Sequence, residues 1–119
     1  MAPIQIPEIP KWLFTVMNNL YEIERKLSTH GDPGNAARNI ERIRESFATA
    51  SALFYEDPLG QPFKETRTDL EASVSGTTTE NLVVVEVIKP IIRFGLSEQS
   101  RVVQKGIVVV EAQKEEQYI

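Results

Sequence analysis

The feature that most constrains this chain is the segment Asp57-Pro58-Leu59-Gly60-Gln61-Pro62-Phe63. Its two prolines and one glycine cannot continue a helix, because proline lacks an amide hydrogen and clashes with the preceding turn. Before this segment apolar residues recur at helical spacing, and after it they alternate as in strands. We therefore predict a rigid joint between a helical half, residues 1–55, and a small β half, residues 56–119.

Composition narrows the class of protein. The chain has 119 residues, a formal net charge of −4 and no cysteine. An acidic chain is a poor partner for nucleic acid, since phosphate neutralisation needs a basic surface. Without cysteine there is no disulfide, no thiolate nucleophile and no Cys-based zinc site, which fits a reducing compartment. We see no signal peptide and no apolar run near the ~20 residues of a membrane span, so we expect a cytoplasmic protein without a membrane partner.

Two apolar stripes define the helical half. The first follows a spacing of four and three residues, and the second repeats it, which is typical of helices packed side by side. Ser28 to Gly31 ends the first helix, and Asp32 or Asn35 is placed to cap the second. A short connection between two such helices predicts an antiparallel hairpin. The stripes are Ile9, Leu13, Val16, Leu20, Ile23 and Leu27, then Ala36, Ile40, Ile43, Phe47, Ala50 and Phe54.

A hairpin of two helices is too thin to bury both stripes. Either two hairpins pair into a four-helix bundle in a homodimer, or the second half of the chain folds back over the stripes. We favour the homodimer, because the β half needs its apolar residues for its own core. The predicted dimerisation residues are Leu13, Val16, Leu20, Ile23, Leu27, Ile40, Ile43 and Phe47.

The second half has the alternation and composition of short strands. Thr68 to Val74 alternates apolar and polar residues, which predicts a half-buried strand. Leu82 to Ile88 is rich in β-branched residues, which predicts a strand buried on both faces, interrupted by Pro90. Further strands are expected at 91–94, 101–104 and 107–112, with a bend at Gly106, a polar loop at 95–100 and a frayed tail at 114–119. The prediction is an α+β fold, helices first, with a small mainly antiparallel sheet or barrel.

The sequence offers little for catalysis. The single histidine, His30, lies in a glycine-containing loop without partners at ligand spacing. Asp69 and Glu71 fit the solvated face of a strand better than an acid–base pair. Ser73 and Ser75 have no histidine nearby to act as a base, and no glycine-rich phosphate loop is present. We predict a protein that is not an enzyme, with no catalytic residue, no metal and no cofactor.

The order of these parts resembles the C-terminal two-thirds of the GrpE family, the nucleotide exchange factors of DnaK-type chaperones. Asp57 to Phe63 is similar to that family's DPLG-x-PF segment, and Leu70-Glu71-Ala72 matches its HEA-like triplet without the histidine. Val84 to Val87 resembles a VVEV-type strand, and Leu13 to Leu20 is similar to "LLPVLDNL". Ser100-Arg101 to Val110 resembles the last strands, so the likeness covers residues 12 to 112. The chain departs from the family in having no room for the long N-terminal coiled-coil helix and in a longer Ile88–Ser100 segment.

The resemblance implies a homodimer with a four-helix bundle and projecting β wings. In the family one wing docks on the nucleotide-binding domain of the chaperone and promotes ADP release, by binding the open cleft better than the closed one. Arg101 aligns with a wing arginine that contacts the chaperone, and Gln104, Ile107 and Pro90 are expected near the same surface. Arg101 is equally compatible with an ordinary charge at a strand end. The alternative function is a dimeric GrpE-like scaffold or adaptor without exchange activity.

Overall fold

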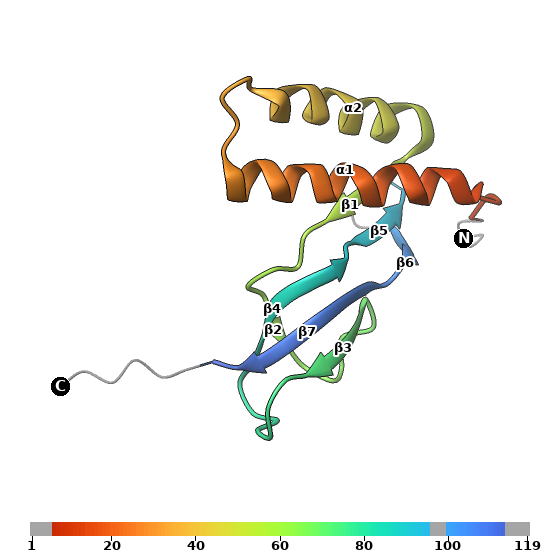
Figure 1. The fold of residues 1–119 in the computed structure, drawn as a ribbon. Helices are drawn as coiled ribbons and strands as arrows, with labels where there is room; N and C mark the ends of the chain where they lie inside the picture. Colours follow the sequence, from red (N-terminus) through yellow and green to blue (C-terminus); the bar gives the residue numbers. More distant parts are fainter. Residues whose placement is uncertain (1–5, 96–99, 114–119) are drawn as a thin grey trace. The chain divides into compact units, whose positions relative to one another are not determined.

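The computed structural model describes residues 6–95 and 100–113 and confirms the α+β class, with two helices preceding a mainly antiparallel sheet (Figure 1). Its contacts divide the chain into two compact units. The first unit contains Met1–Glu56 and Ile92–Val103, and the second contains Asp57–Ile91 and Gln104–Ile119. We had predicted a single boundary at residue 55 and had placed residues 92–103 in the β half.

The first unit begins with the two predicted helices, α1 (Lys11–His30) and α2 (Ala36–Ser51), which lie side by side (Figure 1). Helix α1 ends where Gly31 takes a φ of 94° and donates its amide hydrogen to the Leu27 carbonyl at 2.9 Å. Asp32 then accepts hydrogen bonds from the amides of Ala36 at 2.7 Å and Ala37 at 2.9 Å. Of the two predicted capping residues, Asp32 therefore satisfies the free amides at the start of α2.

Helix α2 ends earlier than the second stripe predicts. Ala52 adopts a left-handed conformation with a φ of 53°, and its amide donates to the Ala48 carbonyl at 3.1 Å. The chain continues as strand β1 (Leu53–Glu56), so the placement of Phe54 on the helical stripe was wrong. The physical reason is burial: Leu53 and Tyr55 are both buried, and residues two apart share a face only in a strand.

Strand β1 belongs to a three-stranded sheet of order β1-β5-β6, with β5 at Ile91–Phe94 and β6 at Arg101–Gln104. The Gly95 amide donates to the Ala52 carbonyl at 2.8 Å, and Arg93 forms an ion pair with Glu56 at 3.2 Å. These interactions attach the segment after β4 to the end of the helical hairpin. They explain why residues 92–103 belong to the first unit.

The second unit is a four-stranded sheet of order β2-β4-β7-β3. Strand β4 pairs antiparallel with β7, from Leu82 opposite Ala112 to Lys89 opposite Ile107. Strand β3 pairs parallel with β7, so the sheet is mainly antiparallel, as predicted, with one parallel pair; the long connection between these two strands permits this arrangement. The strands are β2 (Pro62–Phe63), β3 (Leu70–Val74), β4 (Leu82–Lys89) and β7 (Gly106–Ala112).

Strand β4 was predicted to be buried on both faces, and this was wrong. Val84 and Val87 are buried, whereas Val85 and Ile88 are 42% and 54% exposed. Irregularities in the pairing with β7 follow Val84 and Val87, and such bulges turn the extra residue away from the core. The sheet of the second unit therefore has one buried face. Val84 and Val87 lie on it, opposite Val110 and Val108 of β7.

The Pro/Gly joint lies at the start of the second unit. The Gly60 amide donates to the Val84 carbonyl at 2.9 Å, and the Val84 amide donates to the Gln61 carbonyl at 2.9 Å. Gly60 has a φ of 81°, a conformation that favours glycine. Pro58 is buried, so the joint contributes buried apolar surface to this unit, whereas the helices end earlier, at Ser51.

Two predicted segments fall beyond what the structure describes. Most of the polar loop at 95–100 and the whole tail at 114–119 lie outside the described residues. Within the described residues, neither helix is long and apolar enough to cross a membrane.

Candidate functional site

The predicted dimerisation residues divide into a buried and an uncovered group. Leu20 and Ile40 are buried inside the hairpin, whereas Ile23 and Ile43 remain 44% and 42% exposed. The intermediate members are Leu13, Val16, Leu27 and Phe47. The hairpin's own packing therefore covers only part of the two stripes.

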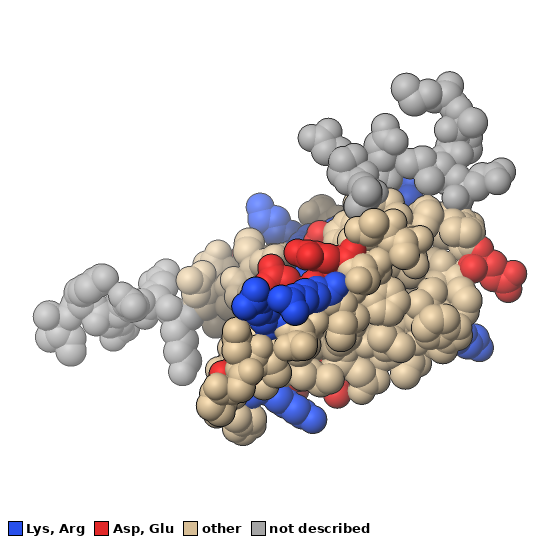
Figure 2. All heavy atoms as spheres, turned by 90° about the horizontal axis from the view of Figure 1, so that it is seen from above, with Lys and Arg blue, Asp and Glu red and all other residues tan. Residues whose placement is uncertain are grey.

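Four exposed or half-buried apolar residues of α1 share one side of the helix. Trp12, Val16, Ile23 and Leu27 are spaced four, seven and four residues apart, which places them within one face at 3.6 residues per turn. Trp12 is 62% exposed. We call these four residues the open α1 face. Figure 2 shows one view of the molecule, in which Lys, Arg, Asp and Glu side chains gather in a few groups and other parts of the surface carry none.

The buried side of α1 includes two residues that the stripe left out. Met17 and Tyr21 are 1% and 3% exposed, and they flank Leu20 on the helix. A spacing of four residues between Met17 and Tyr21 is as helical as the spacing that we selected. The sequence therefore contained two overlapping apolar faces, and the one containing Met17 and Tyr21 packs inside the unit.

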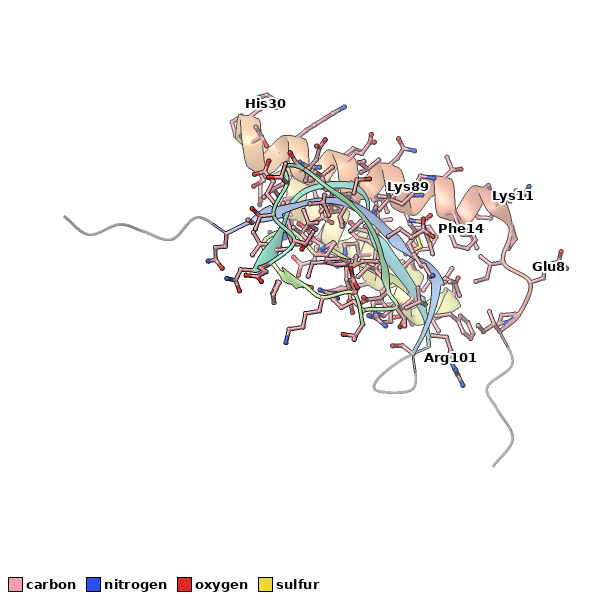
Figure 3. The ribbon with its side chains drawn as sticks, turned by 90° about the horizontal axis from the view of Figure 1, so that it is seen from below. Glu8, Lys11, Phe14, His30, Lys89 and Arg101 are labelled. Carbon is pink, nitrogen blue, oxygen red and sulfur yellow. The ribbon has the colours of Figure 1, made fainter. Side chains whose placement is uncertain are left out.

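The four predicted partner-binding residues are divided between the two units. Arg101, the first residue of β6, is exposed in the first unit and points outward (Figure 3). Pro90, Gln104 and Ile107 belong to the second unit. Pro90 is fully buried, and its carbonyl accepts a hydrogen bond from Gln104 Nε2 at 2.9 Å. The Pro90 ring thus offers no surface to a partner here, and Gln104 holds the chain after β4.

Ile107 is half-buried on β7. Its register neighbours are Glu71 on β3 and Lys89 on β4, and both are exposed. Side chains of residues directly opposite in neighbouring strands lie on the same face of a sheet. Ile107 therefore lies on the more open face of the second unit's sheet, between an acidic and a basic side chain.

A cluster of three polar residues in the first unit was not predicted. Tyr55 donates its hydroxyl hydrogen to Glu24 Oε1, and Arg44 pairs with the same oxygen at 3.5 Å. The Arg44 guanidinium also donates to the Tyr55 carbonyl at 3.2 Å and lies 4.4 Å from the centre of its ring. Burial, followed by the hydrogen bond to Glu24, raises the pKa of the Tyr55 phenol above its ordinary value of 10.0. The cluster joins α1, α2 and β1, which is a structural task.

A cavity of about 450 Å³ lies in the first unit, between the segment before α1, the end of α2, and Leu53 and Phe94. Its lining is mainly apolar, and its polar side chains are Glu8, Thr49 and Ser51. A single carboxylate and two hydroxyls without a histidine do not make a nucleophile with its base. The sequence could not reveal this cavity, because its walls come from three separate segments.

The other residues considered for catalysis or metal binding either form structural hydrogen bonds or face solvent. Asp69 accepts two hydrogen bonds from Arg67, at 3.0 Å from Nε and 2.9 Å from Nη2. His30 stands at the end of α1 opposite Glu8 and Lys11 (Figure 3). Among residues 6–95 and 100–113, no group of three or more His, Asp and Glu side chains is placed to hold a metal ion.

Comparisons of the chain with protein-family models, curated proteins and solved structures found no match. The likeness to the GrpE family therefore rests on the order and spacing of the motifs in this sequence. The geometry adds a helical hairpin with an uncovered apolar face, a Pro/Gly joint and a small sheet, in that order along the chain.

Proposed function

We propose that this chain is a GrpE-like co-chaperone that acts as a homodimer, binds the nucleotide-binding domain of a DnaK-type chaperone and promotes ADP release. The observation that carries the proposal is the open α1 face on a hairpin that is followed, after β1, by the DPLG-x-PF-like joint. The uncovered apolar residues support the dimer, and the order of motifs supports the partner.

The dimer follows from the cost of exposed apolar surface. Burying apolar surface contributes about 25 cal/mol per Å². Trp12, Ile23 and Ile43 are large apolar side chains that remain 62%, 44% and 42% exposed, and a contact between two hairpins would remove them from water. Two hairpins that pack these side chains against each other form a four-helix bundle, in which such spacing is usual.

The dimer is tested by placing a charge on the uncovered part of the stripe. Ile43→Asp places a carboxylate in the proposed apolar contact between hairpins, so we expect the dimer to dissociate while the helices persist. Ser46→Asp, at an exposed position of α2 off the stripe, is the matched control. Light scattering and circular dichroism read the two properties separately. A parent chain that is monomeric at all concentrations contradicts the dimer.

Exchange requires no covalent chemistry. A partner that binds the open cleft of a chaperone more tightly than the closed cleft shifts the equilibrium toward the open state by its difference in affinity. Arg101 is our candidate contact, because it is exposed and because guanidinium groups offer several donors in a fixed fork and are enriched at interface hot spots.

Arg101→Ala tests the contact. We expect it to weaken binding to a DnaK-type nucleotide-binding domain by roughly 1–3 kcal/mol in calorimetry, without changing the melting temperature. Arg38→Ala, which removes an exposed arginine from α2, should leave the affinity unchanged. Equal effects of the two substitutions would remove Arg101 from the interface.

The alternative function is a dimeric scaffold or adaptor without exchange activity. It is favoured by the burial of Pro90 and by the hydrogen bond that Gln104 donates to the Pro90 carbonyl, since both residues then have a structural role within the second unit. The two functions differ in one measurable respect. A stable dimer that binds no DnaK-type chaperone would be a scaffold.

A further inference from the structure

Strand β3 forms an outer edge of the second unit's sheet. In the strand order β2-β4-β7-β3 it has β7 on one side only (Figure 1). An outer strand presents a row of backbone donors and acceptors that another strand of similar length is able to pair with. The question is which groups of β3 face outward and what they fit.

Two backbone hydrogen bonds at the ends of β3 fix the orientation of its backbone. The Gly106 amide donates to the Asp69 carbonyl at 2.9 Å, and the Ser75 amide donates to the Val110 carbonyl at 2.8 Å. Along a parallel ladder, alternate residues turn their N–H and C=O groups toward the same neighbour. Asp69, Glu71, Ser73 and Ser75 thus face β7. The amides and carbonyls of Leu70, Ala72 and Val74 face outward, and within the described residues no backbone partner is recorded for them.

Apart from the charge of Glu71, the described residues of β3 lack the usual protection against pairing. Natural edge strands are blocked by proline, lysine, bulges or very short length. Strand β2, at the opposite edge, has two residues and begins with Pro62. Strand β3 has five residues, no proline and no lysine, and it pairs with β7 without a bulge. Its Val74 side chain is also 43% exposed.

We propose that β3 pairs with β3 of a second copy of this chain, antiparallel, about a two-fold axis at Ala72. In this register Ala72 lies opposite the partner's Ala72, and Leu70 lies opposite the partner's Val74. All three outward residues of each copy then exchange hydrogen bonds, about six in total. Moving the axis by one residue in either direction leaves about four.

The side chains of β3 suit this register. Glu71 lies opposite the partner's Ser73, so the two carboxylates avoid the direct opposition that destabilises like charges in a sheet. On the other face, this register places the partner's Leu70 opposite the Val74 side chain, which is 43% exposed in one copy. An axis at Glu71 would instead place two glutamates opposite each other. The strand is therefore self-complementary in one register, as a two-fold symmetric contact requires.

The contact is small. A pair of five-residue strands buries less than the ~1,200–2,000 Å² of a stable interface, so we expect weak, concentration-dependent association. It uses residues of the second unit only and is independent of the helical dimer. If both contacts form, two-fold contacts at two different surfaces build species larger than a dimer.

Backbone substitution at the edge is the sharpest test. Ala72→Pro deletes an outward amide hydrogen, leaves the bonds to β7 in place, and is of the kind that edge strands tolerate. Val74→Lys adds a charge at the same edge and serves if the proline variant does not fold. Thr78→Lys, in the exposed loop after β3, is the matched control for charge. All are made in the Ile43→Asp background, so that helical association does not contribute.

Sedimentation velocity across micromolar to millimolar concentrations measures the association. We expect the Ile43→Asp chain to self-associate, with at least a tenfold loss for Ala72→Pro and Val74→Lys and no change for Thr78→Lys. Hydrogen exchange should show the Ala72 and Val74 amides gaining protection as concentration rises. Absence of association, or equal association in all variants, would overturn the proposal. Protection that does not change on dilution would also overturn it, because the β3 edge would then be covered by something other than a second copy.

Discussion

Replacing Tyr55 by phenylalanine removes one oxygen from the cluster that joins α1, α2 and β1. The ring remains, and so do its edge-on contact with Tyr21, with centroids 6.0 Å apart, and the overlying Arg44 guanidinium at 4.4 Å. What is lost is the hydrogen bond to Glu24. A hydrogen bond to a charged group contributes about 1.5–3 kcal/mol.

The magnitude must be reduced for solvent access. The Glu24 side chain is 31% exposed and retains its ion pair with Arg44, so water replaces part of the lost interaction. We expect Tyr55→Phe to lower the free energy of unfolding by about 1–2 kcal/mol in urea at pH 7. Glu24→Gln tests the same bond from the other side, with the exposed Glu22→Gln as its control. In a double-mutant cycle the two effects at Tyr55 and Glu24 should not add.

The raised pKa of Tyr55 also gives a pH dependence. Because the folded pKa lies above the unfolded value of about 10, the folded chain retains the phenol proton more strongly. The stabilisation is complete below pH ~10 and is lost as pH rises toward the folded pKa, with a slope of up to about 1.4 kcal/mol per pH unit. Tyr55→Phe should remove this component of the alkaline loss of stability. Identical pH profiles and identical urea midpoints for the two chains would refute the role assigned to the cluster.

Two further substitutions test the packing of each unit. At Gly106 an added Cβ would lie 2.7 Å from Leu70 Cδ2 and 3.0 Å from Ile91 Cγ1. Gly106→Val should therefore destabilise the chain by about 1–3 kcal/mol in thermal unfolding. Unchanged stability would contradict the packing at β7. Asp32→Ala removes the acceptor of two amide hydrogens at the start of α2 and should cost about 0.5–2 kcal/mol, whereas Asp32→Asn should cost less; an equal loss for both would argue against capping.

The helices and the joint were predictable because their causes are local. The apolar spacing of α1, the Gly31 stop and the Asp32 cap each act within a few residues, and the Pro/Gly segment cannot be helical. Strand β1 was missed because Phe54 continues the helical spacing. What ends the helix is the burial of Leu53 and Tyr55, and this depends on the partner strand β5.

The pairing of strands that are distant in the sequence could not be predicted from the sequence. Periodicity indicates that Leu70 to Val74 is a strand, but it does not indicate that β3 lies parallel to β7. The same limit applies to the Glu24–Arg44–Tyr55 cluster, whose members come from three elements. For the candidate site, the exposure of Arg101 agrees with a contact role. The burial of Pro90 depends on tertiary packing, which a match of motifs does not describe.

The proposed nucleotide exchange is measured most directly by the release of labelled ADP from DnaK-type chaperones. Purified chaperones are loaded with fluorescent ADP, chased with unlabelled nucleotide and mixed with increasing amounts of this chain in a stopped-flow instrument. We expect the release rate to rise with the concentration of the chain and to saturate, with a weaker response for Arg101→Ala than for Arg38→Ala. A release rate that is independent of the chain for every chaperone tested would contradict exchange and leave the scaffold function.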